Sequence, residues 1–179
     1  DVVMLGEIRD EETARIAIQS SLTGHLVMST VHTNSAAGAI TRLRDMGIES
    51  FLLASSLKTI ISQRLIRRLC NKCKSESKVS QVAIDLLGLK KGQTVFSAKG
   101  CNDCDGTGFK GRIAIAESIQ VGTVLKDMIH DEASEQDIQN VAFKDIQTID
   151  QIGSELLTKG LTSPEELIRI NNQKEDASV

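Results

Sequence analysis

The chain has 179 residues, and its hydrophobic content of 40% is enough to build a packed core in one or two domains. Trp and Tyr are absent and Phe occurs only four times, so the core must be aliphatic. The net charge of −3 argues against a protein that binds nucleic acid over its whole surface. The sequence shows no signal-peptide pattern and no run of the roughly 18 apolar residues that a membrane-spanning helix needs.

The sequence opens on an apolar segment, Val2 to Leu5, that leads to an acidic residue. This segment has no alternation of polar and apolar residues, which predicts a strand covered on both faces, as in a parallel sheet between helices. Gly6 permits a turn, and Glu7 then follows the carboxyl end of the strand, where open α/β sheets bind their ligands. Because the strand starts at residue 1, we expect the rest of its sheet to belong to sequence outside this chain.

Helix and strand patterns alternate up to residue 68. Asp10 is a good helix cap, and the two glutamates after it favour the first turn of a helix. The pattern predicts a helix over about 11–22, a buried strand over 26–31, a helix over about 35–46 that ends at Gly47, and a helix over about 51–68 capped by Ser50. This alternation predicts the α/β class.

The residue composition and the hydrophobic pattern change at about residue 70 and again at about residue 112. Cys, Gly, Lys and Asp dominate residues 70–111, and the hydrophobic period fades. Only helices are expected after about Gly122, and the polar tail after Asn171 is expected to fray. The individual predictions are a short helix over 81–89, a strand over 113–119, a helix that begins at Ser134, one that ends at Gly160, and one with Ser163 as cap and Pro164 in its first turn.

Two C-x-x-C pairs, Cys70 with Cys73 and Cys101 with Cys104, are separated by 27 residues. Each pair can present two thiolates to one side of a turn, so together they predict a tetrahedral four-sulfur shell for Zn²⁺ in a reducing compartment. Such a shell leaves no open position, which indicates a structural metal. Residues 106–111, GTGFKG, resemble a phosphate loop only weakly. They are predicted to form the turn that closes the cysteine-containing segment. Two separate redox pairs, or four thiols without a role, are the alternatives.

Glu7 has two interpretations. A carboxylate after a buried strand can hold a Mg²⁺-bound water or orient the water that attacks a nucleoside triphosphate. Alternatively, Glu7 is a surface acid paired with Arg9.

The two histidines His25 and His32 bracket the second strand, and in a regular strand they would face opposite sides. His32, with Thr33 and Asn34, follows the carboxyl end of the strand and could contact a phosphate there. Purely structural roles for both histidines are the alternative.

Residues 58–78 carry seven basic side chains against one acidic side chain, a net charge of +6. Such a cluster could meet acidic lipid headgroups or an acidic partner, or it could be the solvated end of a helix. Nucleic acid is not favoured, because no aromatic residues are interleaved for base stacking.

Four segments in chain order resemble the C-terminal half of the secretion and pilus-assembly ATPases, which are the type II secretion protein E family and the type IV pilus assembly motors. They are GEIRDEETARIAIQSSLTGHLVMSTVHTN, RLRDMGIESFLLASSL, SQRLIRRLCNKC and GCNDCDGTGFKGR. The resemblance covers residues 1–119 and, more loosely, 120–170. It implies a RecA-like, P-loop NTPase fold in a hexameric ring on the cytoplasmic face of the inner membrane. ATP hydrolysis there drives platform proteins that assemble pilin or pseudopilin fibres.

The resemblance also implies site residues. VVMLGEIRD resembles the Walker-B segment, with Glu7 near Mg²⁺, and GHLVMSTVHTN resembles the His box, with His25 as γ-phosphate sensor and His32 as a second candidate. Gly6, Glu7, Arg9 and His25 are the implied nucleotide-binding residues. The family's Walker A loop and Asp box match nothing in this chain and are expected upstream of residue 1. We therefore expect the chain alone not to hydrolyse ATP.

The tetracysteine motif resembles the zinc subdomain of the assembly motors, which the retraction motors lack. Residues 1–69 then belong to the ATPase core, 70–111 to the zinc subdomain, and 112–179 to a return strand and helical subdomain. Ala114 and Ala116 replace residues that are often Gly and Tyr in the family, which leaves the secretion and pilus branches open.

In a competing hypothesis, residues 58–179 are a zinc-stabilised module that docks a membrane platform protein. Arg64, Arg67 and Arg68 are then candidate contacts to acidic lipids. No role in binding nucleic acid is expected.

Overall fold

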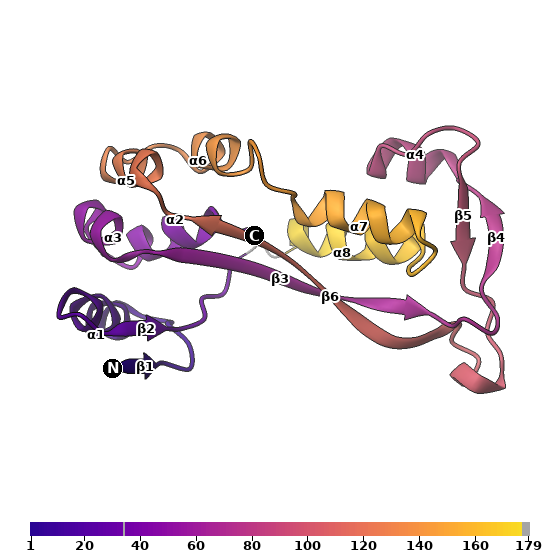
Figure 1. The fold of residues 1–179 in the computed structure, drawn as a ribbon, viewed down its shortest axis with the longest axis horizontal. Coiled ribbons are helices and arrows are strands. Elements are labelled where there is room, and N and C mark those ends of the chain that lie inside the picture. The colour runs from indigo at the N-terminus through magenta and orange to yellow at the C-terminus, as the bar shows by residue number, and fades with distance from the viewer. Residues whose placement is uncertain (34, 177–179) are drawn as a thin grey trace. The chain divides into compact units, whose positions relative to one another are not determined.

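The structure, a computed structural model, describes residues 1–33 and 35–176 (Figure 1). Asn34, which the sequence groups with His32, lies outside the described residues. The chain forms two compact units: the first contains Asp1–Ser62 and Glu117–Ile146, and the second contains Gln63–Ala116 and the residues from Gln147 onward. These units do not coincide with the three predicted segments, whose status as domains stays a prediction.

The first unit contains a parallel pair of strands with helices. Its elements are β1 (Val2–Met4), α1 (Glu11–Leu22), β2 (Leu26–Met28), α2 (Gly38–Asp45), α3 (Ser50–Ser56), α5 (Thr123–His130) and α6 (Glu135–Ala142). β1 and β2 are parallel in the register Val2↔Leu26 to Met4↔Met28, and an isolated bridge joins Ile8 to Val31 beyond them. Helix α3 packs on α5, and α1 contacts both α3 and β2. This arrangement confirms the predicted α/β class.

Local signals set the helix ends of this unit. The Asp10 carboxylate accepts a hydrogen bond from the backbone N–H of Thr13 at 2.9 Å, which caps α1 as predicted. Ala14, Ala17 and Ile18 recur at helical spacing and are buried. Gly47 has a φ of +85° and ends the segment of α2 as predicted.

The prediction that residues 2–5 are covered on both faces is wrong for this chain. Val2 and Met4 are 63% and 73% exposed, whereas Leu5 packs against the core. The reason is that β1 and β2 form a two-stranded sheet in the described residues, and one face of it packs on the helices. The core beside that face is aliphatic, as expected, and contains Ile8, Ile40, Leu53, Ile119, Ile129 and Ile138 among its buried side chains.

The predicted helix over 51–68 is also wrong. Helix α3 ends at Ser56, and Thr59–Leu69 form strand β3, which pairs with β6 (Phe109–Gln120). The β-branched run at residues 59–61 favours an extended backbone, and the partner strand satisfies its hydrogen bonds. Glu49 occupies the N-cap position of α3, and Ser50, which was expected there, is its first helical residue.

The second unit contains the cysteines and two packed helices. Besides parts of β3 and β6, its elements are β4 (Ser75–Lys78), α4 (Gln81–Leu87), β5 (Thr94–Ser97), the 3₁₀ turn η1 (Asn102–Cys104), α7 (Ile149–Thr158) and α8 (Pro164–Asp176). β4 and β5 form an antiparallel pair with α4 between them in the chain (Figure 1). The core of this unit includes Ile66, Val95, Ile115, Leu157, Leu167 and Ile170.

The prediction that only helices follow Gly122 is confirmed for the described residues. Ser134 caps α6 through the backbone N–H of Asp137, and Gly160 follows α7 with a φ of +63°. Helix α8 extends to Asp176, so the expectation of a frayed tail after Asn171 is wrong over that stretch. Among the described helices, none combines the length and the apolar composition needed to cross a bilayer.

Candidate functional site

The four cysteines come together at the end of the second unit where β3 finishes and β6 begins. Their sulfur atoms all lie within 4.8 Å of one another. The Sγ–Sγ distances are 3.9 Å for Cys70 and Cys101, 3.8 Å for Cys73 and Cys104, and 3.7 Å for Cys101 and Cys104. A tetrahedron with metal–sulfur bonds of about 2.3 Å has edges of about 3.8 Å, whereas a disulfide bond is only about 2.05 Å long. The spacing therefore fits a four-coordinate metal.

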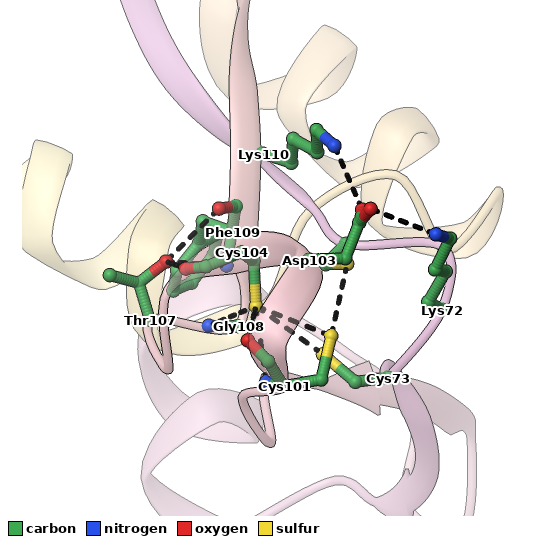
Figure 2. Close-up of polar contacts among 10 residues, drawn as sticks. Lys72, Cys73, Cys101, Asp103, Cys104, Thr107, Gly108, Phe109 and Lys110 are labelled. Atoms are coloured by element: carbon green, nitrogen blue, oxygen red, sulfur yellow. Dashed lines mark hydrogen bonds and ion pairs between the residues drawn. The ribbon is translucent and has the colours of Figure 1, made fainter.

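Each C-x-x-C pair forms the same kind of tight turn. The N–H of Cys73 donates to the carbonyl of Cys70 at 3.3 Å, and the N–H of Cys104 donates to the carbonyl of Cys101 at 3.2 Å. These turns point both sulfurs of a pair to one side. The backbone N–H groups of Cys101 and Gly108 also donate to the Cys104 sulfur, at 3.3 and 3.2 Å (Figure 2). Such donors stabilise a thiolate, the form that binds metals.

The pKa values of the Cys73 and Cys104 thiols are shifted in opposite directions. Burial raises the pKa of the Cys73 thiol to about 12. Burial also opposes ionisation of the Cys104 thiol, but the N–H donors of Cys101 and Gly108 outweigh it and lower its pKa to about 7. The lowered pKa of the Cys104 thiol favours its thiolate, the form that binds a metal.

Residues 106–108 form a turn as predicted, whereas residues 109–111 of the predicted turn belong to strand β6. The carbonyl of Gly108 accepts from the N–H of Cys70 at 2.9 Å, which ties this turn to the first cysteine pair. A Cβ atom on Gly108 would lie 2.5 Å from the Cβ of Ala98, and one on Gly100 would lie 2.3 Å from the carbonyl oxygen of Gly106. The backbone packs so closely around the cysteines that these two positions require glycine.

The basic cluster of residues 58–78 is not a single free surface. Arg67 binds the buried carboxylate of Glu166, and its guanidinium lies 4.1 Å from the centre of the Phe109 ring. Lys74 donates to the carbonyl of Gly160 at 2.7 Å. Arg67 and Arg68 are both exposed, and the alternation of buried and exposed residues along β3 breaks at these two positions. A lipid contact through Arg64, Arg67 and Arg68 stays a prediction, and the structure gives Arg67 a structural contact.

Sequence reasoning missed Glu166, whose side chain is fully buried. It accepts hydrogen bonds from the backbone N–H of Arg67 at 2.9 Å, from Arg67 Nε at 2.8 Å, and from Arg169 Nε at 3.0 Å. Burial opposes its ionisation, but hydrogen bonds from Arg169 and Arg67 prevail and lower its pKa to about 2. No local signal marks this residue, because the sequence around it is an ordinary first turn of a helix.

The residues implied in nucleotide binding lie around the parallel strand pair. Glu7 follows β1, its side chain is 23% exposed, and Arg9 binds its carboxylate at 2.6 Å. The ion pair that the sequence offered as an alternative is therefore present. Gly6 accepts a hydrogen bond from the hydroxyl of Thr30 at 2.8 Å, which links the segments after β1 and β2.

The two histidines lie at opposite ends of these strands. The bridge from Ile8 to Val31 places His32 at the same edge as Glu7. His25 directly precedes β2, whose first residue pairs with Val2, and so lies at the amino edge. Its Nδ1 is 3.2 Å from both the Thr23 hydroxyl and the Ser20 carbonyl. The strand register thus brings His32, and not His25, to the Glu7 edge, and the roles of both stay predictions.

The fold and the cysteine cluster define an α/β protein with a candidate metal site. The chain belongs to the family described as Type II/IV secretion system protein, whose model matches residues 1–169. It is 46% identical over 175 residues to the type II secretion system ATPase E of Vibrio cholerae, covering 97% of this chain and 35% of that protein. It is 42% identical over 173 residues to the type IV pilus assembly ATPase PilB of Thermus thermophilus, covering 94% of this chain and 20% of that protein. The predicted family is confirmed.

Solved structures support the fold. The X-ray structure of the Legionella pneumophila ATPase DotB matches with a TM-score of 0.64 at 18% identity, covering 96% of this chain and 38% of that chain. The ATPase DotB of Yersinia pseudotuberculosis matches with a TM-score of 0.61 at 16% identity, covering 94% of this chain and 36% of that chain. The chain thus spans about a third of the length of the first relatives it matches.

Proposed function

We propose that this chain is the part of a secretion or pilus-assembly ATPase that carries the Walker-B carboxylate, the His box and a structural zinc site. The observation that carries the proposal is the family match over residues 1–169, together with 46% identity to a type II secretion ATPase. The whole protein would act as a hexameric ring on the cytoplasmic face of the inner membrane. It would move platform proteins that assemble pseudopilin or pilin fibres.

In this proposal Glu7 holds a Mg²⁺-bound water or orients the water that attacks the γ-phosphate of ATP. Its position after β1 supports this role, because ligands of open α/β sheets bind beyond the carboxyl ends of the strands. When ATP and Mg²⁺ bind, Arg9 would either release the Glu7 carboxylate from their ion pair or keep this carboxylate in its orientation. His32 shares this edge with Glu7, which favours it over His25 as the residue that senses the γ-phosphate.

ATP turnover would need more than the 179 residues. A P-loop of the form G-x-x-x-x-G-K-[ST] grips the phosphates in this class of enzyme, and the sequence contains no Gly-Lys pair that could end one. The 179-residue chain alone should therefore show no ATPase activity. Measurable turnover by the isolated chain would refute this part of the proposal.

The test of the motor assignment is Glu7→Gln in the full-length ATPase, with Glu12→Gln as the matched control. Glu12 is an exposed acid in the first turn of α1, five positions away in the same segment. Loss of a group that positions the attacking water should lower turnover by about 10² or more. The control should keep turnover within about twofold, because surface substitutions away from a site have small effects. Normal turnover in Glu7→Gln would refute the role of this residue.

We further propose that Cys70, Cys73, Cys101 and Cys104 hold Zn²⁺. Four thiolates at these distances suit a soft, tetrahedral ion, and they leave no position for water, so the metal would join the two cysteine turns and take no part in catalysis. Metal analysis of the reduced chain should give about one zinc per chain. Chelation should increase hydrogen exchange in residues 70–111 before the first unit is affected. Reduced protein without bound metal would refute the site.

The interaction-module hypothesis calls for a separate test. Arg68 is exposed, whereas Arg67 is held by Glu166, so Arg68→Glu tests lipid or partner contact without removing that buried contact. If this face contacts acidic lipid, the full-length protein with Arg68→Glu should bind anionic vesicles more weakly and keep its basal ATPase activity. Equal vesicle binding would leave the motor proposal as the only one supported.

A further inference from the structure

A cluster of three charged side chains joins the two cysteine turns and the start of β6. Lys72 lies between the cysteines of the first pair, Asp103 lies between those of the second pair, and Lys110 lies near the start of β6. Figure 2 shows the Asp103 carboxylate between the two ammonium groups. We name Lys72, Asp103 and Lys110 the clamp.

Each oxygen of the Asp103 carboxylate has its own lysine. Lys72 Nζ lies 2.8 Å from Oδ1, and Lys110 Nζ lies 2.9 Å from Oδ2. The Asp103 side chain is 26% exposed, whereas those of Lys72 and Lys110 are 71% and 61% exposed. The carboxylate is thus the fixed and partly buried centre, and it links the first cysteine turn, the second cysteine turn and β6.

The charges of the clamp match what a metal-loaded cluster needs. Four thiolates around Zn²⁺ leave a formal charge of about −2, which nearby cations stabilise. The hydrogen bonds that both lysines donate to the Asp103 carboxylate raise the pKa of each ammonium group, and the charges of Cys101 on Lys72 and of Cys70 on Lys110 act in the same direction. Lys72 belongs to the first cysteine turn and Asp103 to the second, so the ion pair between them joins the two turns that carry the sulfurs.

The charge of Asp103 alone would act against metal binding. The four-sulfur shell becomes more negative when the thiols lose their protons and bind zinc. A nearby carboxylate repels this negative charge, so a purely electrostatic effect of Asp103 would weaken zinc binding. A carboxylate that fixes two ammonium groups beside the sulfurs, and holds the two turns at the distance a tetrahedron requires, would strengthen it. The two effects have opposite signs, and this difference makes the role of Asp103 testable.

We propose that Asp103 is a positioning residue for the metal site, which it preorganises by holding Lys72 and Lys110 against the two cysteine turns. The proposal rests on the proposed zinc site. Groups that hydrogen-bond to metal ligands typically change metal affinity by about 10- to 100-fold, and the clamp acts on the turns that carry the ligands. The exposure of both lysines places the clamp at the lower end of this range, so we expect about a tenfold effect.

The experiment measures the zinc affinity and the zinc release rate of the reduced 179-residue chain with a competing chromophoric chelator. Asp103→Asn keeps the shape of the side chain and removes its charge. The matched control is Asp105→Asn, which removes the same charge two positions away. Asp105 has a φ of +51°, a conformation that Asn tolerates. Co²⁺ loading reports whether the four-sulfur shell of each variant is still tetrahedral.

We expect Asp103→Asn to bind zinc about tenfold more weakly and to release it faster, while Asp105→Asn stays within about twofold of the wild type. Lys72→Met should also weaken zinc binding. The double variant with Asp103→Asn and Lys72→Met should bind zinc only slightly more weakly than Asp103→Asn alone, because both changes break the same contact between Lys72 and Asp103. Raised salt should speed release from the wild type more than from Asp103→Asn. If Asp103→Asn fails to fold, the variant with both Lys72→Met and Lys110→Met tests the same contact.

Equal or tighter zinc binding in Asp103→Asn would overturn the proposal, since that is the result of charge alone. Equal losses in Asp103→Asn and Asp105→Asn would also overturn it. A wild-type chain that takes up no zinc would overturn the metal site itself, and the role of Asp103 with it. A loaded wild type with an unaffected Asp103→Asn variant overturns only the role of Asp103.

Discussion

Removal of the buried carboxylate of Glu166 should destabilise the second unit more than any other single charge change in α8. The side chain is fully buried, and it accepts hydrogen bonds from Arg67 and Arg169. Breaking a buried ion pair by removing one partner costs about 3–5 kcal/mol. Here the two arginine side chains are 46% and 43% exposed, so water can solvate them once the carboxylate is gone.

The cost is therefore expected below that range. The backbone N–H of Arg67 loses its partner in Glu166→Ala, which costs about 1–3 kcal/mol, and the two solvated guanidinium groups add about 1 kcal/mol. We expect about 3 kcal/mol for Glu166→Ala. Glu166→Gln should cost about 2 kcal/mol, because the amide oxygen can still accept from the Arg67 N–H.

The assay is urea unfolding combined with hydrogen exchange over residues 63–69 of β3 and over α8, which reports on the second unit separately from the first. Glu165→Gln is the matched control, since Glu165 is exposed in the same first turn and should cost less than about 0.5 kcal/mol. If Glu166→Gln and Glu165→Gln unfold at the same urea concentration, the structural role assigned to this buried carboxylate is wrong. Faster exchange in the first unit alone would contradict it equally.

Two further predictions concern acid and the cysteine turn. The folded-state pKa of Glu166 is lowered from 4.5 to about 2, so its stabilisation is fully present above about pH 4.5 and is lost as the pH falls towards 2. Unfolding experiments from pH 6 to about pH 2 should therefore show a smaller loss of stability in Glu166→Gln than in the wild type, and parallel curves would contradict the assignment. Gly100→Ala should lower both stability and zinc content, because its Cβ would lie 2.3 Å from the Gly106 carbonyl oxygen. Gly92→Ala has a similar positive φ and open space around its Cβ, so it should cost only about 1 kcal/mol and keep the zinc; equal effects of the two would refute the close packing at Gly100.

Short-range patterns in the sequence predicted the features that depend on neighbouring residues. The cap at Asp10, the left-handed Gly47 and the start of α6 at Ser134 each follow from contacts within one helical turn. The two C-x-x-C pairs predicted a shared site because each spacing fixes one turn and four sulfurs complete one metal shell. The long motifs also sufficed to predict the family.

Long-range pairing decided the rest. Leu57, Ile61 and Leu65 are at helical spacing, but residues 59–69 are a strand because the distant strand β6 supplies its hydrogen bonds. The parallel register of β1 and β2 sends His32 and His25 to opposite edges, which spacing along one strand could not determine.

What the sequence determined by itself was most of the local turns and caps, the α/β class and the candidate metal ligands. Only the tertiary structure decided which acidic side chains are withdrawn from water: Glu166 is buried and Asp103 is partly buried, although both look like ordinary surface acids in the sequence. Glu166 meets Arg67, and Asp103 meets Lys72, because strand pairing and helix packing bring distant segments together. The physical reason is that the sequence gives the type of each charged residue directly. Its burial and its partners depend on residues as far as 99 positions away, and only the folded structure brings these together.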